Sequence, residues 1–103
     1  LAPEMMERWA LAEMLRIKGW LLHCKGETIA AESTYQASLA WAGQQQAKSW
    51  ELRTSTSLAR LWQSQGKMKE AHDLLGSVYN WFTEGFDTKD LKDARLLLSE
   101  LNA

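Results

Sequence analysis

The sequence resembles itself when it is displaced by forty residues. Gly26 then falls on Gly66, and Ala31 falls on Ala71, five residues after each glycine. The other coincidences are Gly19 with Ala59, Leu21 with Leu61, Leu22 with Trp62, Tyr35 with Leu75 and Ser38 with Val78. A period of this length is typical of stacked helical units, so the repeat constrains the fold more than any other feature.

Hydrophobic spacing predicts helices along the whole chain. No segment alternates apolar and polar residues as a half-buried strand does, and apolar or small residues instead recur every three or four positions. The predicted helices span about residues 3–25, 28–44, 48–65, 67–82 and, after an N-cap at Asp87 or Thr88, up to about 102. The sequence therefore predicts an all-α domain built from antiparallel helical hairpins.

Glycines and one proline mark most of the predicted helix ends. They are Pro3 in the first turn, Gly26 as a left-handed cap, Gly66 after the third helix and Gly85 after the fourth. The tract 43–48, which begins with Gly43, fits either a turn or a continuous helix. We place a tight turn near residues 45–47, because an uncapped helix over 28–65 would be unusually long.

Residue size along the helices predicts the core. Small residues at Gly19, Ala31, Ala59 and Ala71 predict close helix crossings, with larger side chains around them. The predicted buried face of the second helix consists of Ala31, Tyr35, Ser38 and Ala42. That of the fifth helix consists of Leu91, Ala94, either Leu97 or Leu98, and Leu101. Of the six tryptophans, Trp9, Trp62 and Trp81 are expected in the core, whereas core and surface are both open for Trp20, Trp41 and Trp50.

The spacing resembles the tetratricopeptide repeat, whose pattern is W-x₂-L-G-x₂-Y and then A-x₃-F. The two units read Leu15-x₂-Lys18-Gly19-x₂-Leu22 then Ala31-x₃-Tyr35, and Ser55-x₂-Leu58-Ala59-x₂-Trp62 then Ala71-x₃-Leu75. Lys18 stands where the pattern has leucine, and Gly43 and Thr83 stand where it has a proline at the end of each unit. The period is 40 residues rather than 34. The resemblance implies one domain over 1–103, stacked as a superhelix, with units at 13–46 and 53–86 and a capping helix over 87–103. The alternative is an unrelated helical bundle.

A second resemblance covers about residues 13–103, and the segment WFTEGFDTKDLKDA is its most specific part. It is to the C-terminal end of large bacterial signalling proteins, which place a nucleotide-cyclase or DNA-binding domain and a predicted ATPase before a tetratricopeptide-like array. Because the chain begins with Leu1, we interpret it as a piece of a longer protein. It has no G-x₄-G-K-[ST] loop, so neither catalytic activity carries over, and we expect no enzyme activity and no cofactor.

The resemblance also implies a candidate binding face, because the first helix of each tetratricopeptide unit lines the concave side. Carried over by position, that face comprises Glu13, Arg16, Trp20, His23, Arg53, Thr56, Arg60 and Gln63. Three arginines beside an aromatic residue predict a groove for an acidic or C-terminal peptide, since guanidinium groups bind carboxylates in a bidentate manner. The alternative is a solvated face, or one that another part of the parent protein covers.

Composition argues against several other functions. A net charge of −1 gives no general attraction to nucleic acid or to an anionic membrane, and no apolar run is long enough to span one. His23 and Cys24 are adjacent and point about 100° apart on a helix, so with His72 elsewhere they predict no metal site. Acidic residues such as Asp90 and Asp93 lie beside lysines, as on a solvated face. The single cysteine fits a reducing compartment, and we expect the cytoplasm.

These observations predict a non-catalytic module for protein–protein interaction or scaffolding, whose partner is a protein, a peptide or another domain of the parent. The alternative is a regulatory segment that modulates a linked nucleotide cyclase or ATPase. Because two repeat units are fewer than such arrays usually need, we also expect this piece to form a homodimer through its N-terminal edge.

Overall fold

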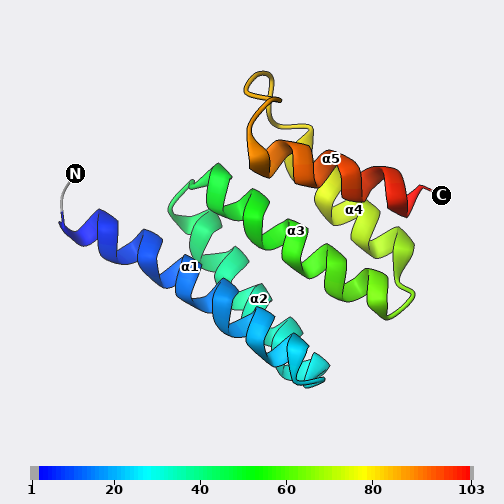
Figure 1. Ribbon diagram of the computed structural model, residues 1–103. Helices are drawn as coiled ribbons and strands as arrows, with labels where there is room; N and C mark the ends of the chain where they lie inside the picture. The colour runs from blue at the N-terminus through cyan, green and yellow to red at the C-terminus, as the bar shows by residue number, and fades with distance from the viewer. Residues whose placement is uncertain (1–2, 103) are drawn as a thin grey trace.

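The computed structural model describes residues 3–102, with side chains from residue 10 onward. In this range the chain forms α-helices and no strand, which confirms the all-α prediction (Figure 1). The helices are α1 (Pro3–Cys24), α2 (Thr28–Gln44), α3 (Lys48–Ser64), α4 (Met68–Tyr79) and α5 (Lys89–Leu101).

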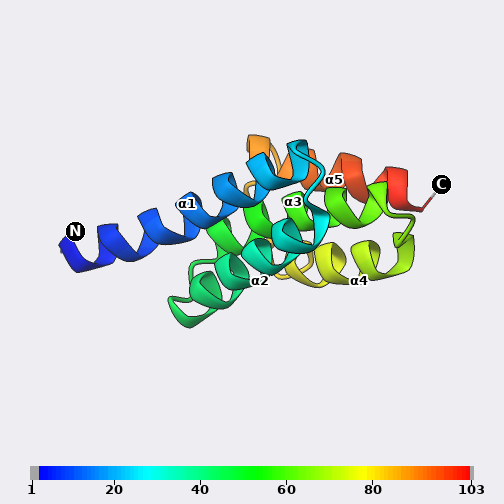
Figure 2. The same ribbon diagram turned by 90° about the horizontal axis from the view of Figure 1, so that it is seen from below.

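The helices lie in two layers. Figure 2 shows α1, α3 and α5 in one layer and α2 and α4 in the other. The α1–α2 and α3–α4 hairpins lie beside each other, and α5 packs on both α3 and α4. Within the described range α1 contacts only α2 and α3, so it forms one edge of the array.

Three turns of the same kind connect the first four helices at intervals of twenty residues. In each turn one residue has a positive φ: 81° at Gly26, 53° at Gln46 and 78° at Gly66. The next N–H donates to the carbonyl five residues earlier, as in a Schellman motif. These bonds are Glu27 to Leu22 at 2.9 Å, Ala47 to Ala42 at 2.9 Å and Lys67 to Trp62 at 2.8 Å. The predicted turn at residues 45–47 is therefore confirmed, although no glycine marks it.

The four small residues of the predicted crossings are buried, and a close crossing is shown at Gly19. A Cβ atom placed on Gly19 would meet the ring of Tyr35 at 2.7 Å, so α1 and α2 could not approach this closely with a larger residue. Ala31, Ala59 and Ala71 are completely buried. The predicted buried faces of α2 and α5 are also confirmed, with Leu97 rather than Leu98 fully inside.

The core has two clusters that share a tryptophan. The first joins α2 to α3 through Ala31, Tyr35, Leu58 and Leu61. The second joins α3, α4 and α5, and Trp62 packs against both. Buried polar groups also link helices, because Ser38 Oγ lies 2.8 Å from the carbonyl of Ala12 and 2.9 Å from Thr54 Oγ1. That network connects α1, α2 and α3 where no water reaches.

The sequence prediction fails at the end of the fourth helix. The helix ends at Tyr79 rather than at residue 82, because the N–H groups of Trp81 and Phe82 bond to carbonyls three residues earlier in a tighter turn. The change of helical phase turns Phe82 toward the core. Trp81 is left 58% exposed, which contradicts its expected place in the core.

The other tryptophans divide between core and surface. Trp62 is in the core as predicted, whereas Trp20 is 54% exposed. Trp41 and Trp50 are half-buried, and Trp9 lies outside the residues whose side chains are described.

Candidate functional site

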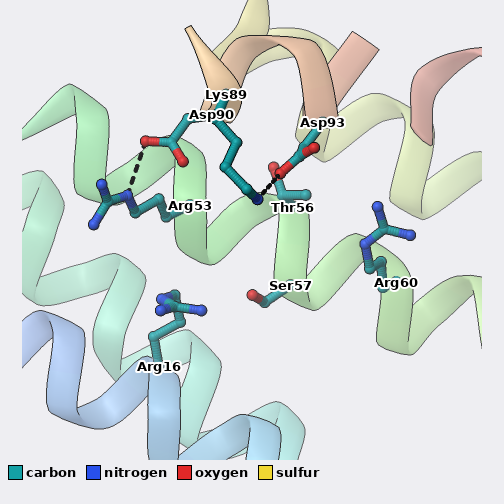
Figure 3. A pocket seen from close by; sticks show the side chains of 8 residues that line it. All are labelled: Arg16, Arg53, Thr56, Ser57, Arg60, Lys89, Asp90 and Asp93. Atoms are coloured by element: carbon teal, nitrogen blue, oxygen red, sulfur yellow. Dashed lines mark hydrogen bonds and ion pairs between the residues drawn. The ribbon is translucent and has the colours of Figure 1, made fainter. Parts of the chain in front are cut away.

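A polar cavity of about 360 Å³ opens between α1, α3 and α5. Figure 3 shows its side chains, which come from all three helices of one layer. It is lined by Arg16, Arg53, Thr56, Ser57, Arg60, Lys89, Asp90 and Asp93. We call this cavity the arginine groove. Four of these side chains are cationic and two are anionic, so the lining has a net positive charge.

Helical geometry explains why these residues meet. Residues three or four positions apart lie on the same helix face, which brings Arg53, Thr56, Ser57 and Arg60 together on α3. The forty-residue repeat places Arg16 on α1 at the position that Thr56 has on α3. The N-terminal turn of α5 then closes one side of the groove.

One arginine of the groove already binds a carboxylate of the same chain. Arg53 Nε donates to Asp90 Oδ2 at 2.8 Å, so α5 is tied to α3 across the groove (Figure 3). The guanidinium group of Arg53 also lies over the ring of Trp50, with 5.2 Å to the ring centroid. A cation near an aromatic face is attracted to the ring, so this contact helps to hold the Arg53 side chain beside Asp90.

Arg16 is held by a second carboxylate, that of Glu13. Arg16 Nε donates to Glu13 Oε2 at 3.2 Å, a second bond joins Arg16 Nη2 to Glu13 Oε1, and Arg53 Nη1 lies 4.0 Å from Glu13 Oε2. The hydrogen bond from Arg16, with the charges of both arginines, lowers the pKa of Glu13 despite partial burial, and the same bond raises the pKa of Arg16. Its lowered pKa means that Glu13 loses its proton more readily than an isolated glutamic acid.

The third arginine has no such partner. Arg60 is exposed, and among the described residues its guanidinium group makes no ion pair or hydrogen bond. Figure 3 shows it apart from the two dashed ion pairs, which join Arg53 to Asp90 and Lys89 to Asp93. Its donors are available to an anion that enters the groove.

The structure brings together half of the predicted site residues. Arg16, Arg53, Thr56 and Arg60 line the groove, and Glu13 adjoins it through its bonds to two of them. Trp20, His23 and Gln63 do not line it, Trp20 being exposed and the other two half-buried.

Four lining residues were not among the predicted site residues: Ser57, Lys89, Asp90 and Asp93. Asp90 is not simply part of a solvated face, because it is the acceptor for Arg53. A sequence signal existed for Asp93, since a further displacement by forty aligns Glu13, Arg53 and Asp93.

Other kinds of site find little support in the described part of the chain. No group of three or more histidine, cysteine or acidic side chains is placed there to hold a metal ion, and Cys24 is exposed without a disulfide partner. None of the described helices is both long and apolar enough to span a membrane.

Comparison with known proteins gives no match, whether with family models, with curated proteins or with solved structures.

Proposed function

We propose that this chain is a helical-repeat module for protein–protein interaction, and that its arginine groove binds an acidic peptide segment of a partner. The observation that carries the proposal is the convergence of three arginines and a lysine from α1, α3 and α5 on one open polar cavity. An anionic segment gains from several cations at once, and charged hydrogen bonds are the strong ones in proteins.

The Arg53–Asp90 pair supports a carboxylate as the group that the groove binds. Its Nε–Oδ2 distance of 2.8 Å is typical of a charge-assisted hydrogen bond. Arg60 offers the same chemistry without a competing partner among the described residues. A peptide with two or more acidic side chains would reach Arg60 first and would compete with Asp90 for Arg53.

The matched burial of repeat positions supports the assignment to tetratricopeptide-like repeats. Gly19 and Ala59 are both buried, as are Ala31 and Ala71, while Gly26 and Gly66 both have a positive φ. A rigid array of this kind suits recognition of an extended segment. That the module regulates a linked cyclase or ATPase stays a prediction.

The test is binding of a short fluorescent oligoglutamate peptide, measured by fluorescence anisotropy at low salt. Arg60→Glu exchanges an attractive contact for a repulsive one, and losing one charged hydrogen bond of about 2 kcal/mol weakens binding by roughly thirty-fold. The matched control is Arg95→Glu, which makes the same charge change at an exposed position of α5 outside the groove. Equal losses in both variants, or no binding by the unmodified chain, would refute the proposal.

A second variant tests whether Asp90 competes with the peptide for Arg53. Asp90→Asn frees Arg53 and is expected to tighten binding of the same peptide several-fold, whereas Glu100→Gln, at an exposed position of α5, removes one negative charge outside the groove. If the two variants gained equally in affinity, the effect would depend on net charge alone, and this would contradict a specific role for Arg53.

A further inference from the structure

Two exposed apolar side chains lie on the helix faces that line the arginine groove. Trp20 follows Arg16 by four residues, so it lies on the same face of α1, about 6 Å further along the helix axis. Leu96 follows Lys89 by seven residues, or two turns, on the groove side of α5. Trp20 is 54% exposed and Leu96 is 60% exposed. The apolar side chains therefore continue the faces from which the charged ones project.

The repeat sets the order of these side chains across the layer. Displacement by forty residues places Trp20 on Arg60, and it places Thr56, one turn before Arg60, on Leu96. Equivalent positions of stacked units lie beside each other. Figure 2 shows α1, α3 and α5 in one layer, and α3 contacts both of the other two helices. Arg60 therefore lies on the middle helix, with an exposed apolar side chain on the helix at either side.

The charges of the groove leave one cation for a ligand to bind without competition. Arg16, Arg53 and Lys89 each form an ion pair within the described residues, whereas Arg60 forms none there (Figure 3). Any further charged bond to a peptide has to displace a carboxylate of the chain itself. One charged hydrogen bond does not offset the freedom that a peptide loses on binding. Apolar contact has to supply the rest of the affinity.

Trp20 is accessible for such a contact. It makes no ring contact, cation–π contact or hydrogen bond with another described residue. Trp81 is similarly exposed, but Lys48 Nζ lies 5.5 Å from the centroid of its ring and the Phe82 ring centroid lies 5.2 Å away. Tryptophan and arginine are the side chains that most often dominate binding at protein interfaces. Trp20 beside Arg60 combines the two.

We propose that the groove selects an acidic segment with the pattern apolar–x–acidic–x–apolar, in which Arg60 binds the acidic side chain and Trp20 and Leu96 contact the apolar ones. This inference rests on the proposed function and specifies the peptide class. In an extended peptide, side chains two residues apart lie on the same side, roughly 7 Å from each other. Neighbouring helices are about 8–10 Å apart. A segment lying across the layer therefore reaches α1, α3 and α5 with three alternate side chains.

Fluorescence anisotropy with two labelled, C-terminally amidated peptides tests the proposal. The peptides LEEEL and SEEES have equal length and equal charge, so their difference in affinity reports apolar contact alone. We expect the unmodified chain to bind LEEEL about ten-fold more tightly. Trp20→Ala should reduce this preference to about three-fold or less and leave the affinity for SEEES unchanged. The matched control is Trp81→Ala, which removes an equally exposed tryptophan outside the groove and should keep the full preference.

Two further variants separate the contributions. Trp20→Phe retains an aromatic surface and is expected to keep most of the preference. Arg60→Glu should weaken both peptides, because both supply the same carboxylates. Circular dichroism checks that the helices persist, as expected for an exposed position that receives alanine, the best helix former.

The outcomes distinguish this inference from the proposed function. If SEEES binds through Arg60 and LEEEL binds no more tightly, the inference is wrong while the proposed function stands. A preference that survives Trp20→Ala, or that Trp81→Ala removes equally, would also overturn it. If neither peptide binds the unmodified chain, both proposals are wrong.

Discussion

Replacing Gly19 with alanine tests the close crossing of α1 and α2. Glycine to alanine in a helix interior normally stabilises by about 0.5–1 kcal/mol, because glycine loses more backbone entropy on folding. At Gly19 the added Cβ would lie 2.7 Å from two atoms of the Tyr35 ring. Tyr35 is completely buried, so its ring cannot move aside without displacing other side chains. Overpacking of this kind costs about 1–3 kcal/mol, and we therefore expect a net loss of ~1–2 kcal/mol.

The assay is urea denaturation followed by circular dichroism, with Gly76→Ala as the matched control. Gly76 lies inside α4, and a Cβ there would meet nothing within 4 Å, so this variant is expected to gain about 0.5–1 kcal/mol. The two substitutions are chemically identical and should have opposite signs. If Gly19→Ala stabilises the protein as much as Gly76→Ala does, then α1 and α2 do not cross closely enough for a Cβ on Gly19 to meet the Tyr35 ring.

The repeat suggests a second substitution that should restore the stability lost in Gly19→Ala. In the second hairpin the equivalent pair is Ala59 and Leu75, both completely buried. The double variant Gly19→Ala, Tyr35→Leu installs that pair in the first hairpin and is expected to recover at least ~1 kcal/mol relative to the sum of the single variants. Additive losses would show that the two crossings are not equivalent.

Three further predictions concern single positions. Gln46→Gly is expected to stabilise by about 1 kcal/mol in the same denaturation assay, because Gln46 has a φ of 53° where the equivalent turns have glycine, and a loss would contradict it. Ser55→Ala is expected to be neutral or to stabilise by up to ~1 kcal/mol, since the buried Ser55 Oγ has no hydrogen-bond partner in the described part of the chain. For Glu13, whose folded pKa is below its ordinary value of 4.5, the stabilisation is complete at neutral pH and is lost as the pH falls through the folded pKa. The difference in unfolding free energy between the unmodified chain and Glu13→Gln should therefore shrink in acid, and a difference independent of pH would refute the ion-pair argument.

Much of the fold could be predicted because local rules and the repeat agree. Gly26 and Gly66 end their helices with a positive φ, as expected of C-terminal caps. The turn near Gln46 was predictable from helix length alone, since the residue itself gives no local signal. The end of α4 was not predictable. No proline or glycine stops the helix before Gly85, whereas in the structure the chain forms a tighter turn after Tyr79 and Phe82 packs against the core.

The candidate site was predictable only in part, for a similar reason. Arg16, Arg53, Thr56 and Arg60 follow from helix periodicity combined with the forty-residue repeat. The role of Asp90 depends on where the connection after α4 places the first turn of α5, and that connection has no counterpart in the other units. Sequence periodicity fixes which face of a helix a residue occupies, but not which charged group lies opposite it.

The most direct test of the central claim is an NMR titration of the labelled chain with the oligoglutamate peptide. We predict that the largest amide shifts fall on Thr56, Ser57 and Arg60 of α3 and on the first turn of α5, and that they disappear at high salt. Shifts confined to α1 residues outside the groove, or the absence of any saturable shift, would contradict the assignment of the arginine groove as a site for acidic peptides.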